Sequence, residues 1–172
     1  MLDATTIATL ARQLYDARKT RTPLRHFSRA HPQMTIDDGY ACRREWGKLE
    51  LADGQRIRGR KIGLTSRAMQ QASQITEPDY APLMDDMFFE QGGDIPIHRF
   101  IAPRVEDELA FVIGRAGRGT GATHRDGLAA GEGTGVGVGL AVATGARLGF
   151  GGGGTTVVVK FAQRYSRGVR PD

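Results

Sequence analysis

Two glutamates, Glu106 and Glu108, stand two residues apart in the segment RVEDELAFVIG, from Arg104 to Gly114. The segment alternates and then ends in an apolar run, which predicts a β-strand, and successive side chains of a strand point to opposite faces. Both carboxylates are therefore expected on one face, where they repel each other unless a cation neutralises them or one is protonated. Their oxygens suit magnesium, manganese or calcium, although an exposed strand with its acids in solvent is the more common origin of this spacing.

A lysine, Lys61, lies in a second segment of strand character, RIRGRKIGL, between Gly59 and Gly63. Glycines in a strand let a ligand or another chain segment approach closely, so a lysine there could hold an anionic substrate or move a proton. A surface lysine on an edge strand is the alternative. Asp79 lies in the segment EPDY, which is typical of a loop, and acids in turns are usually turn formers. From the residues alone, Asp79 is the weaker candidate.

Helices are expected ahead of these strands. Apolar residues recur at helical spacing over residues 7–15, with Thr5 and Thr6 as candidate N-caps. After a connector with two prolines, Thr35 and Asp38 have the spacing of a capping box, which predicts the start of a second helix. The chain is therefore expected to open with a helical region.

The second helix is expected to end at the turn Asp53-Gly54, and the strand with Lys61 follows from Arg56 to Leu64. Thr65 or Ser66 then predicts the cap of a short helix. These elements are those that must position Lys61 and the two glutamates.

Composition divides the chain near Gly114. The first 113 residues hold 16 of the 24 basic and 16 of the 19 acidic residues, so the net charge of +5 falls within the last 59, which also hold 17 of the 24 glycines. We expect three parts: a helical region over residues 1–55, a strand-forming part over 56–114, and a flexible Gly-rich tail over 115–172.

Several classes of protein are excluded by residue content. No run of 18 apolar residues is present, and the first 20 residues lack the pattern of a secretory signal, so we expect a cytoplasmic protein. A single cysteine, Cys42, cannot form an internal disulfide, and with four histidines no Cys/His zinc spacing can be built. Disulfide scaffolds and zinc fingers are ruled out.

Three longer motifs carry a resemblance: GRKIGLTSRAMQ (59–70), EPDYAPLMDDMFF (77–89) and DIPIHRFIAPRVEDELAFVIG (94–114). In order and spacing they are similar to the hydratase and decarboxylase group of the fumarylacetoacetate hydrolase superfamily. The resemblance covers roughly residues 1–114. It implies an α+β fold in which the N-terminal helical region leads into a mixed β roll, with residues 56–114 as the N-terminal part of the catalytic β domain. It also implies homo-oligomers of intact relatives.

The resemblance also implies an activity: a metal-dependent lyase that adds water to a 2-hydroxy-2,4-dienoic acid and gives a 4-hydroxy-2-oxo acid. A divalent cation, usually magnesium or manganese, would chelate the substrate carboxylate and its 2-oxygen and stabilise the enolate. The partner would be a small-molecule 2-oxo acid, without nucleic acid or membrane. Arg67 and Arg104 are candidates for steering a substrate with two negative charges.

Site residues follow from the same resemblance, position by position. The metal ligands fall on Glu106 and Glu108, with a further carboxylate some thirty residues later. Lys61 matches the lysine of the K-I-G-L motif and would bind the oxyanion or relay protons. Asp79 matches a loop acid that would serve as a proton-transfer partner.

Beyond Gly114 the expected continuation is not recognisable, so we expect the β roll to be truncated. The offset to the third ligand falls near Gly139, and Glu132 is the only acid between Asp126 and Asp172. The third ligand is therefore expected to be missing. We hypothesise a shifted reading frame in a GC-rich gene, since the chain has 20 arginines, 4 lysines and no asparagine.

Other functions remain open alternatives. Within the same family a decarboxylase acting on 4-oxalocrotonate would use the same metal chelation, and a catalytically inert fragment is the alternative from another class. In the tail, GFGGGG (149–154) has nucleotide-binding glycine spacing, but TTVVVK after it predicts a strand where a helix is required. GRAGRG (114–119) lacks the interleaved aromatics that RNA binding by base stacking uses.

Overall fold

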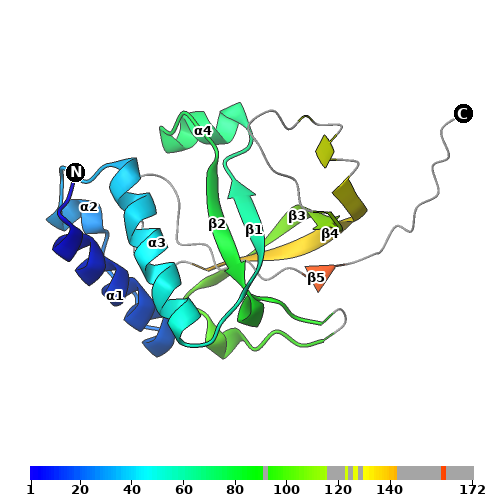
Figure 1. The fold of residues 1–172 in the computed structure, drawn as a ribbon, viewed down its shortest axis with the longest axis horizontal. Coiled ribbons are helices and arrows are strands. Elements are labelled where there is room, and N and C mark those ends of the chain that lie inside the picture. The colour runs from blue at the N-terminus through cyan, green and yellow to red at the C-terminus, as the bar shows by residue number, and fades with distance from the viewer. Residues whose placement is uncertain (91–92, 116–122, 124–125, 128–129, 143–159, 162–172) are drawn as a thin grey trace, which may run out of the picture.

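The computed structural model describes residues 1–90, 93–115, 123, 126–127, 130–142 and 160–161, without the side chains of residues 104, 106, 107, 132–142 and 160–161 (Figure 1). The helices at the start of the chain lie side by side at one end, a two-stranded sheet occupies the middle, and a three-stranded sheet lies beyond it. The predicted α+β class is confirmed.

Helix α1 (Ala4–Thr20) begins directly after Asp3, whose carboxylate accepts a hydrogen bond from the backbone N–H of Thr6 at 2.9 Å. The prediction of Thr5 or Thr6 as the N-cap is therefore wrong. The Asp3 carboxylate accepts from both the backbone and the hydroxyl of Thr6, so it caps the helix two or three residues before the position at which either threonine would.

Helix α3 (Ile36–Ala52) follows the single turn of α2 (Phe27–Ala30). The predicted capping box is confirmed, because Thr35 Oγ1 accepts from the N–H of Asp38 at 3.2 Å and Asp38 Oδ2 accepts from the N–H of Thr35 at 2.9 Å. Asp38 also accepts from the N–H of Leu2 at 2.9 Å. The buried carboxylate thereby joins the start of α1 to the start of α3.

The main apolar core lies between α1, α2 and α3. Helical spacing on α1 and α3 brings their apolar faces together, which is the usual source of stability for amphipathic helices. Cys42 is fully buried there, and burial raises the pKa of its thiol to about 11. The cluster consists of Ile7, Leu10, Ala11, Leu14, Phe27, Met34, Cys42 and Trp46.

The predicted strand with Lys61 is confirmed as β1 (Ile57–Gly63), and Ser66 caps α4 (Arg67–Ser73) by accepting from the N–H of Met69. Strand β1 pairs antiparallel with β2 (Asp79–Met84). The expectation of a loop at Asp79 is wrong, since Asp79 is the first residue of β2. Turn-forming residues end at Pro78. Beyond it, pairing with β1 decides the conformation, because Asp79 lies opposite Gly63, 16 positions back in the chain.

Short 3-10 turns η1 (Asp85–Met87) and η2 (Ile97–Arg99) precede β3 (Pro103–Ile113), the predicted glutamate strand, which is confirmed. It pairs antiparallel along its length with β4 (Gly131–Val142), which pairs in turn with β5 (Lys160–Phe161). The sequence analysis expected a flexible Gly-rich tail over residues 115–172, whereas residues 131–142 form the regular strand β4. Backbone hydrogen bonds do not need side chains, so the partner strand β3 can order a Gly-rich segment that has weak propensity of its own.

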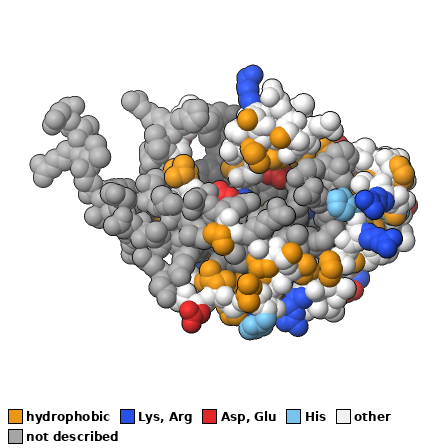
Figure 2. All heavy atoms as spheres, turned by 180° about the vertical axis from the view of Figure 1, so that it is seen from behind, with side chains coloured by type: hydrophobic (Ala, Val, Ile, Leu, Met, Phe, Trp, Pro, Cys, Tyr) orange, Lys and Arg blue, Asp and Glu red, His pale blue; other side chains and the backbone are white. Residues whose placement is uncertain are grey.

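One face of β3 carries large apolar side chains at alternate positions that are mostly exposed: Val105, Leu109, Phe111 and Ile113. On the face shown in Figure 2, apolar side chains reach the surface in several patches. Within the described part of the chain, no helix has the length and apolar character needed to cross a membrane. The nucleotide-like segment 149–154 and residues 116–119 of the arginine-glycine segment lie outside the described residues.

Candidate functional site

Lys61 and Glu108 meet between the two sheets. The Nζ of Lys61, in β1, lies 2.5 Å from Oε1 of Glu108, in β3, although 47 residues separate them in the chain. The Lys61 side chain is 15% exposed and that of Glu108 is 33% exposed. The pair is therefore shielded on the lysine side and open to solvent on the carboxylate side, which is where a small ligand could reach it.

Asp79 lies on the same face as Lys61. In the antiparallel register Lys61 is opposite Ala81 and Gly63 is opposite Asp79, and side chains directly opposite each other share a face. Residues two apart on one strand share a face as well, so Lys61 and Asp79 belong to one side of the β1–β2 pair. The structure thus brings Asp79, Lys61 and Glu108 to one region.

Glu106 lies two residues before Glu108 in β3, in register with Gly139 of β4. Glu108 is in register with Gly137. The side chain of Glu106 is outside the described part of the structure. Its carboxylate at the site stays a prediction based on the two-residue repeat of a strand.

The two arginines that the sequence analysis singled out are not brought to this site by the described contacts. Arg67 is the first residue of α4 and lines an open hollow on that helix together with Gln70, Gln74 and Ile75. Arg104 lies in β3 opposite Ala141, and its side chain is not described. Steering of substrate by either arginine stays a prediction.

The carboxylates available for a metal ion are few. Among the described residues, no group of three or more His, Cys, Asp or Glu side chains lies close enough to hold a cation. Strand β4 places glycine opposite both Glu106 and Glu108, and its one acid, Glu132, lies five residues before Gly137, about 17 Å along a strand. A magnesium ion commonly keeps several waters beside one or two protein carboxylates, so Glu108 together with the predicted Glu106 carboxylate would suffice to hold one.

Lys61 affects the binding of a cation at Glu108, because its ammonium already neutralises this carboxylate. A divalent cation at the same carboxylate would have to share it with Lys61 or displace the ammonium. The arrangement therefore favours weak cation binding that strengthens when an anionic ligand supplies further oxygens.

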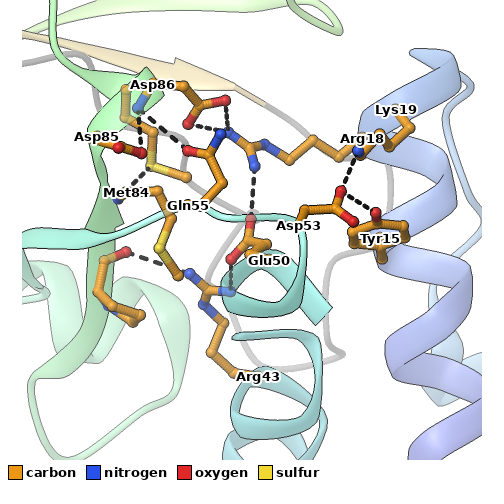
Figure 3. A network of polar contacts seen from close by, with 12 residues as sticks. Tyr15, Arg18, Lys19, Arg43, Glu50, Asp53, Gln55, Met84, Asp85 and Asp86 are labelled. Carbon is orange, nitrogen blue, oxygen red and sulfur yellow. Dashed lines mark hydrogen bonds and ion pairs between the residues drawn. The ribbon is translucent and has the colours of Figure 1, made fainter. Parts of the chain in front are cut away.

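A second charged cluster, which the sequence analysis missed, ties the helices to the first sheet (Figure 3). Glu50 of α3 is 1% exposed and accepts from Arg18 at 2.7 Å and from Arg43 at 3.1 Å. Arg18 also donates to both oxygens of Asp86, at 2.8 and 2.9 Å, and Arg43 donates to the carbonyl of Pro82 at 3.3 Å. Arginines suit such paired contacts because the guanidinium is a planar fork of donors.

A sequence signal for this cluster did exist. Asp38, Cys42, Trp46 and Glu50 recur every four residues along α3, and all four are buried. A glutamate that continues a buried helical stripe must have a cationic partner, because an unpaired buried carboxylate is costly. That partner could not be identified from the sequence, since Arg18 is 32 residues away.

Next to this cluster lies a cavity of about 310 Å³. Lys19 and Tyr15 both contact Asp53 at its wall, and Arg18, Glu50 and Asp86 form another part of the lining. Lys19 is paired with Asp53, and Arg18 is paired with Glu50 and Asp86. The cavity is therefore explained by the network that holds the helices to η1.

No family model matches the chain. It is 51% identical over 123 residues to 2-oxo-hept-4-ene-1,7-dioate hydratase of Escherichia coli, an alignment that covers 72% of this chain and 46% of the relative. It is 35% identical over 134 residues to 2-hydroxyhexa-2,4-dienoate hydratase of Comamonas testosteroni, covering 77% of this chain and 51% of the relative. The chain spans about half the length of the curated relatives it matches.

The fold is similar to that of 4-oxalocrotonate decarboxylase from Pseudomonas putida G7, solved with magnesium and adipate. The TM-score is 0.83 at 23% sequence identity, and the match covers 92% of this chain and 64% of that chain. A second structure of the same decarboxylase, with calcium and acetate, gives the same TM-score. The predicted fold is confirmed by this similarity.

Proposed function

We propose that the site around Lys61 adds water to a 2-hydroxy-2,4-dienoic acid, because the chain belongs to the hydratase and decarboxylase family of the fumarylacetoacetate hydrolase superfamily. The substrate class comes from the two hydratases to which the chain is similar, and 2-oxohept-4-ene-1,7-dioate is the specific candidate. A role in the degradation of 4-hydroxyphenylacetate and a cytoplasmic location remain parts of this proposal.

The observation that carries the proposal is the meeting of Lys61 and Glu108 on the face that holds Asp79. An ammonium group with low exposure binds the carboxylate and 2-oxygen of an α-oxo acid well, because charge pairs strengthen away from water. Asp79 is the first residue of β2. In this proposal its carboxylate exchanges a proton with water or with the substrate chain.

The reaction balances with one water molecule. The dienol first shifts a proton from its 2-hydroxyl to C5, which leaves a 2-oxo acid with a double bond between C3 and C4. Water then adds at C4, giving negative charge on the 2-oxygen, and a proton returns at C3. Lys61 would stabilise the charge on the 2-oxygen, and Asp79 would take the proton from the attacking water.

A divalent cation belongs to the proposal, with Glu106 and Glu108 as its protein ligands. Support comes from the donor chemistry of β3 and from the similar fold of a decarboxylase solved with magnesium or calcium. When bound, such an ion would polarise the 2-oxo group. Magnesium and manganese are the proposed ions, and the scarcity of carboxylates in β4 predicts weak affinity without substrate.

Turnover tests this proposal directly. The full chain is mixed with 2-hydroxyhepta-2,4-dienedioate and magnesium, and the loss of conjugated-diene absorbance is followed. Lys61→Met should abolish the loss, whereas Lys48→Met, an exposed lysine on α3, should retain it. Absence of turnover by the unchanged chain, with an intact hydratase active in the same assay, would establish the inert alternative.

A decarboxylase is the second candidate, favoured by the fold similarity to 4-oxalocrotonate decarboxylase. Its substrate would use the same anion contacts, and its product is distinguished by release of carbon dioxide. Gas measurement with 4-oxalocrotonate separates the two reactions. Self-association is proposed as well, and the exposed apolar face of β3 gives it a physical basis.

A further inference from the structure

Gly63 and Asp79 face each other across the β1–β2 pair. A β-carbon built on Gly63 would overlap Oδ1 of Asp79 and lie 3.3 Å from its Cγ. The carboxylate of Asp79 therefore occupies the space that a side chain at position 63 would take. The carboxylate therefore lies over β1 as well as beside its own strand, β2.

This places the Asp79 carboxylate in line with Lys61. Lys61 and Gly63 are two residues apart on β1, and two residues of a strand span about 6.7 Å. The acid of β2 thus stands where the next side chain of β1 on that face would be.

We propose that Gly63 is a positioning residue, which by lacking a side chain admits the Asp79 carboxylate to the face of β1 that carries Lys61. The effect of Gly63 on turnover rests on the proposed function. The placement of the carboxylate is independent of that function.

The backbone conformation at position 63 does not require a glycine. Among the described glycines, positive φ is recorded at Gly54, whereas Gly63 has an ordinary conformation that alanine can adopt. The Asp79 carboxylate fills the space over position 63 and thereby excludes a side chain there. Because the overlapping atoms are the end of the Asp79 side chain, an added methyl group would turn the carboxylate away and leave the strands paired.

Gly59 provides a matched control on the other side of Lys61. A β-carbon there would lie 3.5 Å from Cζ of Phe88 and 3.7 Å from Cδ1 of Leu83, which are ordinary contact distances. Gly59→Ala and Gly63→Ala thus add the same methyl group to the same strand, two residues before and two residues after Lys61. They differ in whether the methyl group meets Asp79.

The first arm of the test is nuclear magnetic resonance of the full chain with ¹³C-labelled aspartate carboxyls at neutral pH. The Asp79 signal is assigned by its loss in Asp79→Ala. We expect Gly63→Ala to shift this signal and Gly59→Ala to leave it unchanged. An Asp79 signal in Gly63→Ala that equals that of the unchanged chain overturns the proposal.

A failure of Gly63→Ala to fold is resolved by the double variant Gly63→Ala/Asp79→Ala. If the methyl group disturbs the chain through Asp79, the double variant folds with the melting temperature of Asp79→Ala. A double variant that stays unfolded shows that Gly63 is needed for another reason, which contradicts the proposal.

The second arm is turnover, in which Gly63→Ala should lower kcat about 10²-fold with little change in KM, as expected when an acid–base group is displaced. Combining it with Asp79→Ala should lower kcat no further, because both changes remove the same group. If the unchanged chain shows no turnover, the proposed function fails, while the resonance arm still decides the role of Gly63.

Discussion

The ammonium of Lys61 lies 2.5 Å from the carboxylate of Glu108, and this contact joins the two-stranded sheet to the three-stranded sheet. The contact is a property of the tertiary structure, since the partners are 47 positions apart in the sequence. The same pair stands at the centre of the proposed site. Its removal should therefore affect stability as well as ligand binding.

Glu108→Gln should lower the free energy of unfolding by about 1 kcal/mol, the amount typical of a partly shielded charged hydrogen bond. The amide keeps the shape of the side chain and removes its charge. Urea unfolding followed by circular dichroism measures the change. The control is Glu45→Gln, whose exposed pair with Lys48 should contribute close to nothing. Equal losses for the two variants would contradict this prediction.

Glu50→Gln should be more damaging, with a loss of about 3 kcal/mol, because two arginines would keep their charges beside a neutral, buried amide. Denaturant unfolding is again the measurement, and Glu45→Gln serves as the exposed comparison. A loss below about 1 kcal/mol would mean that water reaches the Glu50 cluster and replaces the missing charge.

Cys42 should give the protein a pH dependence in alkali. Burial raises the pKa of the folded thiol to about 11, whereas the pKa of an unfolded thiol is about 8.5. Thiolate forms first in the unfolded chain, so the stability contribution is complete below about pH 8.5 and is lost as pH rises towards the folded pKa. Unfolding free energies between pH 7 and 10 measure it, and Cys42→Ala should flatten this part of the profile.

The phenol of Tyr40 reports on Asp79. Burial raises the pKa of Tyr40, and the carboxylates of Asp79 and Glu77 raise it further by opposing the phenolate. Asp79→Asn should therefore lower the Tyr40 pKa. Phenolate absorbance during alkaline titration measures this, with Tyr40→Phe identifying the signal. A Tyr40 midpoint that does not move in Asp79→Asn would place the Asp79 charge away from the ring.

Local elements were largely predictable because their signals act within one turn or one strand. The capping box of Thr35 and Asp38, the Ser66 cap and the strand of Glu106 and Glu108 all follow from residues at most four positions apart. The same locality explains the errors. Asp3 competes with two nearby threonines for one cap, and Asp79 becomes a strand residue through its pairing with Gly63.

The sequence by itself determined the family motifs, the helical start of the chain and the two-residue spacing of the β3 glutamates. Only the tertiary structure decided that Lys61 contacts Glu108, that the Asp79 carboxylate lies over Gly63, and that Glu50 has two arginine partners. The physical reason is that hydrogen bonding along the backbone is short in range, whereas ion pairs and close contacts depend on how whole strands and helices come together.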